Sequence, residues 1–187
     1  MVSIPEPAKS GTPSKESTDE QLALAREQGL AYGKAVAEMA TAEADDGSQV
    51  EAGDLLVAYA VEQAEGMYVW ADGQLRWQDP TDENAHIEVV VRDAYDGRFV
   101  PGLDVTVTLS TSDGTEVGTH GQPFLWHPWL HHYGRNWKVP GDGQYRLAVH
   151  IEPAPFMRHD KENGTRFAQA VEVEWPDISI ETGQKKG

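Results

Sequence analysis

The feature that most constrains the fold is an alternation of apolar and polar residues that begins near Asp54 and recurs to about Trp175. A period of two places successive side chains on opposite faces of a strand, so each run predicts a β-strand with one buried face. The runs cover residues 55–61, 67–70, 86–91, 103–109, 145–151 and 168–175. Asp-Gly pairs, which favour tight turns, separate several of them. Because no helical pattern intervenes, we expect about seven strands in an all-β fold, an antiparallel sandwich of immunoglobulin-like type.

A helical pattern precedes the strands. The segment Ser17-Thr18-Asp19-Glu20 has the spacing of a capping box, and apolar residues then recur at helical intervals from Leu22 to Met39. We expect one amphipathic N-terminal helix within residues 18–46 that packs its apolar stripe on the domain that follows. Residues 1–17, rich in Pro, Ser, Lys and Glu, predict a disordered tail or linker. The predicted domain spans residues 50–177, and residues 178–187 are expected to form a flexible tail.

The charge of the chain excludes several classes of partner. Its formal net charge is −16, from 31 acidic and 15 basic residues. Nucleic acids and anionic membranes bind basic surfaces, so neither is expected as a partner. An acidic surface of this kind is also typical of proteins adapted to high salt, where screening weakens self-repulsion. The N-terminal segment lacks the apolar stretch of a signal peptide, so we expect the signal or anchor of an exported protein to lie outside this chain.

Histidine is concentrated in one part of the sequence. Six of the seven histidines lie between His120 and His159, and the chain has no cysteine. Because imidazole is the commonest metal-ligating side chain, this cluster predicts a metal site of nitrogen and oxygen ligands, with room for a methionine. For any single ring, the alternative is an ordinary hydrogen-bonded histidine in a partly buried position.

The seventh histidine lies on a predicted strand. In residues 86–91 the side chains of Ile87 and Val89 share the face expected to point to the core. His86 and Glu88 then project together from the other face, about 7 Å apart along the strand. One interpretation is that both contact a metal ion. The other is that both are solvated on an outer sheet face.

The segment 123–137 is rich in Pro, Trp and Gly and predicts a long ordered loop. His127 and His131 have helical spacing, but Pro128 disfavours a helix there. His120 and His150 are not expected to be direct ligands, because His120 has no evident partner and His150 shares a polar strand face with Arg146. The indoles of this part of the chain either pack the loop and core or form a platform for a glycan or peptide: Trp126, Trp129, Trp137 and Trp175.

Several separated motifs together resemble a known family. They are His132-Tyr133-Gly134-Arg135-Asn136, Gly143-Gln144-Tyr145-Arg146-Leu147, Ile151-Glu152-Pro153 and Arg158-His159-Asp160-Lys161-Glu162-Asn163-Gly164. These motifs, and their order along the chain, are similar to those of the periplasmic high-affinity iron-transport proteins. Members of that family are copper- and iron-binding partners of a bacterial iron permease. A treponemal lipoprotein is a relative of that family. The resemblance covers residues 54–175 and implies an immunoglobulin-like homodimer with a metal site near the subunit interface.

The resemblance also implies a set of metal ligands. By position they fall on His86, Glu88, His132 and His159. The family's methionine ligand, which precedes the histidine of the His-Tyr-Gly motif by seven residues, corresponds to Leu125, which cannot ligate a metal. Because a thioether favours Cu(I), its loss predicts a site for Cu(II), Zn(II) or iron. In this interpretation His127 or His131 replaces the missing donor.

These observations predict a non-enzymatic, extracytoplasmic protein, periplasmic or at the cell surface, that binds a transition-metal ion. Copper or iron is expected, and zinc also fits the ligands. The predicted role is to support iron uptake through a membrane permease. The alternative is an immunoglobulin-like module that recognises a glycan or protein through its Trp-rich loop. A copper oxidoreductase ranks last, because the sequence offers no nucleophile paired with a base and no phosphate-binding glycine loop.

Overall fold

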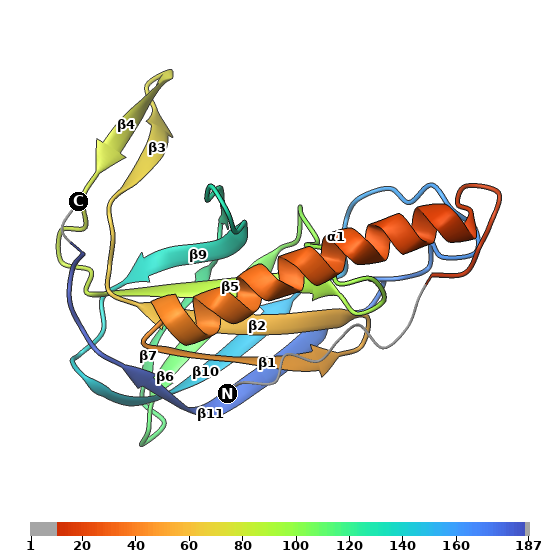
Figure 1. Ribbon diagram of the computed structural model, residues 1–187. Helices are drawn as coiled ribbons and strands as arrows, with labels where there is room; N and C mark the ends of the chain where they lie inside the picture. The colour runs from red at the N-terminus through yellow and green to blue at the C-terminus, as the bar shows by residue number, and fades with distance from the viewer. Residues whose placement is uncertain (1–10, 186–187) are drawn as a thin grey trace.

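Two antiparallel β-sheets packed face to face form the body of the protein, and one long helix crosses the outer face of the first sheet (Figure 1). The computed structural model describes residues 11–185. The first sheet has the strand order β1 (Asp46–Ala52), β2 (Leu55–Glu62), β5 (Ala85–Asp93), β9 (His132–Trp137) and β8 (Phe124–Leu125). The second has the order β11 (Val171–Ile180), β10 (Gly143–Ile151), β6 (Val105–Thr111) and β7 (Glu116–Gly121). A separate hairpin, β3 (Met67–Ala71) and β4 (Gln74–Gln78), stands away from the body.

The core lies between the two sheets, on the faces that the period of two predicts. Ile87, Val89 and Val91 of β5 are fully buried against residues such as Leu109 of β6 and Leu147 of β10. Full burial of one such side chain contributes roughly 1.5–3 kcal/mol to the free energy of unfolding. The apolar side chains that face each other between the two sheets therefore dominate the stability of the sandwich. The prediction of an all-β immunoglobulin-like sandwich with an N-terminal helix is confirmed.

The helix α1 (Asp19–Glu38) begins with a capping box one residue later than the Ser17-to-Glu20 spacing predicted, and it continues as one π-helical turn, Met39–Glu43. The side chain of Thr18 accepts a hydrogen bond from the backbone of Gln21, and the Gln21 side chain accepts one from the backbone of Thr18. At its other end, Val36 and Met39 pack on Ala58, Ala60 and Val90 of the first sheet and on Leu130. The outer face of that sheet is therefore covered by the helix.

The structure differs from the sequence prediction at strands that lack a clear alternation. The polar strand β1 lies where the helical segment 18–46 was expected to end, and β8 and β9 lie inside the expected loop 123–137. In β9 both faces are covered, so His132, Tyr133 and Gly134 are all buried and no alternation marks the strand. The eleven strands within residues 11–185 therefore exceed the number expected.

Both terminal segments are held by contacts where flexible tails were expected. In the described part of the first tail, Thr12 N–H donates to Asn163 Oδ1 at 2.9 Å and the Ser14 hydroxyl donates to Asp160 Oδ2 at 3.0 Å. At the other end, Ile178 and Ile180 are buried in the core. Residues 1–10 and 186–187 lie outside the described part of the chain.

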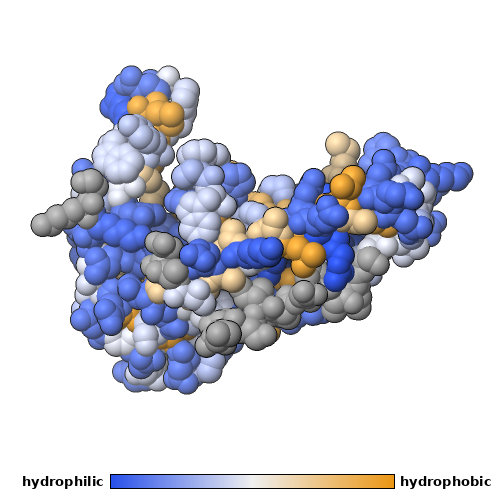
Figure 2. Space-filling view, in the orientation of Figure 1, coloured by the Kyte–Doolittle hydropathy of each residue, from blue (hydrophilic) through white to orange (hydrophobic). Residues whose placement is uncertain are grey.

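Hydrophilic residues cover most of the face shown in Figure 2, as the net charge of −16 leads one to expect. Neither described helical segment has the length and apolar composition needed to cross a bilayer.

Candidate metal centre

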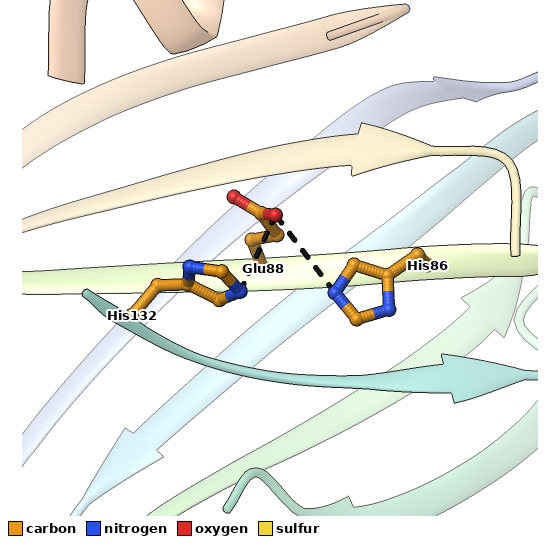
Figure 3. Close-up of side chains that lie close together, drawn as sticks. All are labelled: His86, Glu88 and His132. Carbon is orange, nitrogen blue, oxygen red and sulfur yellow. Dashed lines mark ion pairs between the residues drawn. The ribbon is translucent and has the colours of Figure 1, made fainter. Parts of the chain in front are cut away.

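Three of the predicted ligands converge on the outer face of the first sheet, at the end of α1 where Met39 lies (Figure 3). His86 and Glu88 project from the same face of β5, as their strand phase predicts. His132 begins the neighbouring strand β9 and lies diagonally across from Glu88, whose direct partner is Gly134. The Oε1 atom of Glu88 is 3.8 Å from His86 Nε2 and 3.3 Å from His132 Nε2. These donors lie within 4.8 Å of one another, a spacing that one ion with bonds of about 2 Å can bridge.

Burial and hydrogen bonding orient both rings before any ion binds. His86 is 0% exposed, His132 3% and Glu88 6%, so the interpretation of a solvated pair on an outer face is wrong. His86 Nδ1 is 2.9 Å from Asn136 Oδ1, an oxygen that can only accept, so this nitrogen donates and carries the proton. His132 Nδ1 donates in the same way to the Leu130 carbonyl at 3.2 Å. Each ring therefore turns a bare Nε2, without a hydrogen-bond partner, toward Glu88.

The electrostatics of the cluster also favour a cation. Burial lowers the pKa of His86 to about 4, and burial with the neighbouring His86 lowers the pKa of His132 to about 4. Both rings are thus neutral at pH 7 and available as ligands. Burial, assisted by the nearby charge of Glu65, raises the pKa of Glu88 to about 8. A metal ion bound here would displace the Glu88 proton, because a metal ligand must be deprotonated.

Gly134 keeps open the space between the two rings. A Cβ atom at this position would lie 3.1 Å from His86 Nε2, 3.1 Å from His132 Cδ2 and 3.2 Å from the Ile87 carbonyl oxygen. Any side chain would therefore press on both imidazoles at once. The glycine of the His-Tyr-Gly motif thus has a steric role in the cluster.

A pocket of about 80 Å³ adjoins the cluster and brings in further donors. It is lined by Glu88, His132, Glu62, Glu65, Met39, Leu130, His127, Trp129 and Lys185. The Oε1 atom of Glu65 is 3.9 Å from His86 Nε2, and burial raises the pKa of Glu65. Sequence reasoning missed Glu65, which lies in an irregular segment, and assigned Met39 only to the apolar stripe of the helix. No periodic pattern signals either contribution.

Of the two histidines proposed to replace the methionine, only His127 lines the pocket. Its ring centroid is 6.4 Å from that of His132. The ring of His131 instead packs edge-on against Phe99 and Phe124, with centroids 6.4 and 5.6 Å away. Leu125 pairs with His132 across β8 and β9, so the residue at the family's methionine position is a direct cross-strand neighbour of a candidate ligand.

His159 lies far from the cluster within the same chain. Its side chain is 95% exposed, and its Nδ1 atom is 3.1 Å from Glu16 Oε2, just before α1 begins. Met39, which lines the pocket, follows the other end of α1. The 20 residues of that helix span about 30 Å, so His159 cannot bind the same ion as His86 within one molecule.

The remaining histidines and indoles have other contacts. His120 packs on Trp137, with ring centroids 4.7 Å apart, and His150 pairs with Glu152 and Glu172 on the second sheet. Trp137 is buried and Trp175 packs on Tyr59, so neither belongs to an open platform. Trp126 and Trp129 are exposed.

Comparison with known proteins agrees with the motifs. Residues 40–181 match the model of a family described as Fe²⁺ transport protein. The chain belongs to this family. The resemblance noted in the sequence is therefore confirmed. The match begins after Met39 and ends before Lys185, so these two residues that line the pocket lie outside the matched region.

Solved structures with the same fold include FetP and P19, and each of these proteins has a structure with copper. FetP from uropathogenic E. coli strain F11 is 22% identical, with 72% of this chain and 93% of FetP covered and a TM-score of 0.59. Copper-reconstituted P19 from Campylobacter jejuni is 19% identical, with 74% of this chain and 96% of P19 covered and a TM-score of 0.59. A FetP variant with bound copper is 23% identical. No curated protein matches the sequence.

Proposed function

We propose that this protein binds a copper or iron ion at His86, Glu88 and His132 and supports iron uptake. The observation that carries the proposal is the pair of buried Nε2 atoms that face one carboxylate and have no hydrogen-bond partner. Buried polar atoms without partners cost free energy, and a bound cation would remove that cost for all three residues. A FetP variant and P19 bind copper, which supports a transition-metal ion as the species bound by the present protein.

The donors favour a borderline metal ion. Two imidazoles and a carboxylate suit Cu(II), Fe(II) and Zn(II), and His127 supplies a third ring at the pocket. Met39 contributes the thioether that Leu125 does not. Of the two histidines proposed to replace the methionine, the pocket supports His127 rather than His131, and it adds Met39, which the sequence did not suggest.

A homodimer would bring His159 to the site. Its exposed ring cannot reach the cluster of its own chain, but a second copy can present it if its segment 155–167 covers the pocket. We infer that His159 acts across the subunit interface that the family resemblance implies. The site within one chain then keeps an open coordination position, which favours release of the ion as well as capture.

The biological role we propose is non-enzymatic. The protein would hold the ion outside the cytoplasm and present it to a membrane iron permease. Incomplete coordination within one chain supports such a transfer role, since dissociation of the dimer would weaken the site.

Metal titration tests the proposal. Untagged protein stripped with chelator should bind Cu²⁺ and, without oxygen, Fe²⁺. A variant carrying both His86→Ala and His132→Ala should lose at least about a hundredfold in affinity, because two ligands are removed. His120→Ala, which removes an imidazole packed on Trp137, is the matched control and should change little. Equal affinities in the double variant and the control would reject the site.

A further inference from the structure

We propose that Tyr32 of helix α1 is a positioning residue for His132: its hydroxyl holds the peptide group between His131 and His132 and so sets the direction in which the His132 ring enters the metal site. Tyr32 acts through the backbone beside His132 and is not itself a ligand. The inference rests on the proposed function and deepens it, because it gives the N-terminal helix a part in metal binding.

The contact joins two residues that lie far apart in the chain. The Tyr32 hydroxyl donates a hydrogen bond to the backbone carbonyl of His131, 99 positions further along the sequence. That carbonyl and the backbone nitrogen of His132 belong to one peptide group, which is planar. A hydrogen bond that fixes the carbonyl therefore also fixes the backbone from which the His132 ring projects.

The Tyr32 side chain is itself held in place. Its ring is partly buried and packs on Phe99, with ring centroids 5.8 Å apart. Phe99 in turn stacks on Tyr133, the residue that follows His132, with centroids 5.5 Å apart. Burial raises the pKa of Tyr32 above its ordinary value, so the phenol keeps its proton near neutral pH. The hydroxyl therefore remains a hydrogen-bond donor under the conditions in which metal binding is measured.

A glycine lets the helix approach closely enough for this contact. Gly29 lies three residues before Tyr32 and therefore on the same face of α1. A Cβ atom at position 29 would lie 1.7 Å from the carbonyl oxygen of Asp96, in the turn after β5. The helix backbone thus lies directly against the backbone of the sandwich, and the Tyr32 hydroxyl reaches the segment before β9.

The same helical segment also supports the His132 ring. His132 Nδ1 donates to the Leu130 carbonyl at 3.2 Å, and the Leu130 side chain is 2% exposed and packs with Met39, which follows α1. The His86 ring is oriented differently, by Asn136 of β9 at 2.9 Å. The helix therefore supports one of the two imidazoles, and this difference provides a test.

The Tyr32 contact lies outside the part of the chain that matches the family. Helix α1 ends at Glu38, whereas the match to the Fe²⁺ transport family begins at residue 40. The orientation of His132 in this protein thus depends on a segment that precedes the matched region.

Cu²⁺ titration of the full-length, metal-free protein tests the inference. Tyr32→Phe removes one hydroxyl and keeps the ring on Phe99, and it should lower Cu²⁺ affinity about tenfold, as expected when an outer partner of a metal ligand is lost. The electron paramagnetic resonance spectrum of the bound Cu²⁺ should also change, because the His132 ring changes orientation. Tyr145→Phe is the matched control and should alter neither, since the hydroxyl of Tyr145 on β10 donates to another backbone carbonyl, that of Gly141.

Two variant backgrounds separate the positioning of His132 from a general loss of packing. In His86→Ala the tenfold effect of Tyr32→Phe should persist, whereas in His132→Ala it should fall below about twofold, since no ring is left to position. Equal losses in both backgrounds, or an unchanged affinity and spectrum in Tyr32→Phe alone, overturn the inference while the proposed function stands. If the natural protein binds no Cu²⁺, the proposed function fails and this inference fails with it.

Discussion

Histidines near the two ends of helix α1 lie in opposite environments. Near one end, His86 and His132 are buried on adjacent strands, and each is oriented by a hydrogen bond from Nδ1. Near the other end, His159 is 95% exposed on a loop, and its Nδ1 atom lies 3.1 Å from Glu16 Oε2. The strand-borne rings are ordered before an ion arrives, whereas the loop ring loses conformational entropy when it binds. In our proposal the strand-borne histidines therefore define the site, and His159 contributes only where a second molecule brings it near.

The largest expected effect tests this contrast directly. His132→Ala should lower Cu²⁺ affinity by at least about a hundredfold, because it removes a buried, oriented imidazole and leaves only His86 and Glu88 of the cluster. His159→Ala should cost about tenfold, and only at protein concentrations where dimers form, because its ring must come from a second copy. Competitive titration at low and high protein concentration measures both effects. A larger loss for His159→Ala in dilute monomer would reverse the comparison.

Glu88 makes the stability of the metal-free protein depend on pH. Its pKa is raised from 4.5 to about 8 in the folded state, so the stability that it contributes is complete below pH 4.5 and is lost as pH rises through about 8. The loss is at most about 1.4 kcal/mol for each pH unit in this window. Glu88→Gln cannot ionise and should be more stable than the natural protein at pH 9, although it binds metal more weakly.

Urea unfolding with chelator present, at pH 5 and pH 9, measures the difference. Glu51→Gln, which alters an exposed carboxylate on the edge strand β1, is the control and should follow the natural protein. The contribution of Glu88 is refuted if Glu88→Gln and the natural protein lose the same stability between the two pH values.

A smaller effect is expected at Gly134. Gly134→Ala should lower metal affinity about tenfold, because the added methyl group displaces both rings from their orientation and small misplacements of ligands weaken coordination. Gly141→Ala is the matched control, since a Cβ atom there meets nothing within 4 Å. Titration of both variants with Cu²⁺, after circular dichroism confirms the fold, tests whether the space between the rings matters. Equal affinities would show that the rings tolerate the methyl group.

The smallest expected effect concerns the thioether. Met39→Leu conserves side-chain volume and should lower Cu(I) affinity about fivefold while leaving Zn(II) affinity unchanged, because sulfur favours the softer ion. Leu125→Met should raise Cu(I) affinity, since it adds a thioether beside His132. Competition with a Cu(I)-specific chelator measures both changes. Parallel losses of Cu(I) and Zn(II) in Met39→Leu would assign Met39 to packing alone.

The sequence by itself determined the features that depend on neighbouring residues. The period of two predicted the sandwich, the capping box predicted the start of the helix, and strand phase placed His86 and Glu88 on one face. The His-Tyr-Gly motif indicated the family, which the match over residues 40–181 confirms. These features follow from local geometry, since side-chain direction along a strand or helix is fixed by spacing in the chain.

Only the tertiary structure decided which donors meet. Pairing of β5 with β9 placed His132 diagonally across from Glu88, and the packing of α1 buried a face that alternation alone left open to solvent. The same packing separated His159 from the cluster, and the C-terminal segment brought Lys185 to it. Such contacts join residues distant in the chain, and their free energy depends on register and burial that no local pattern encodes.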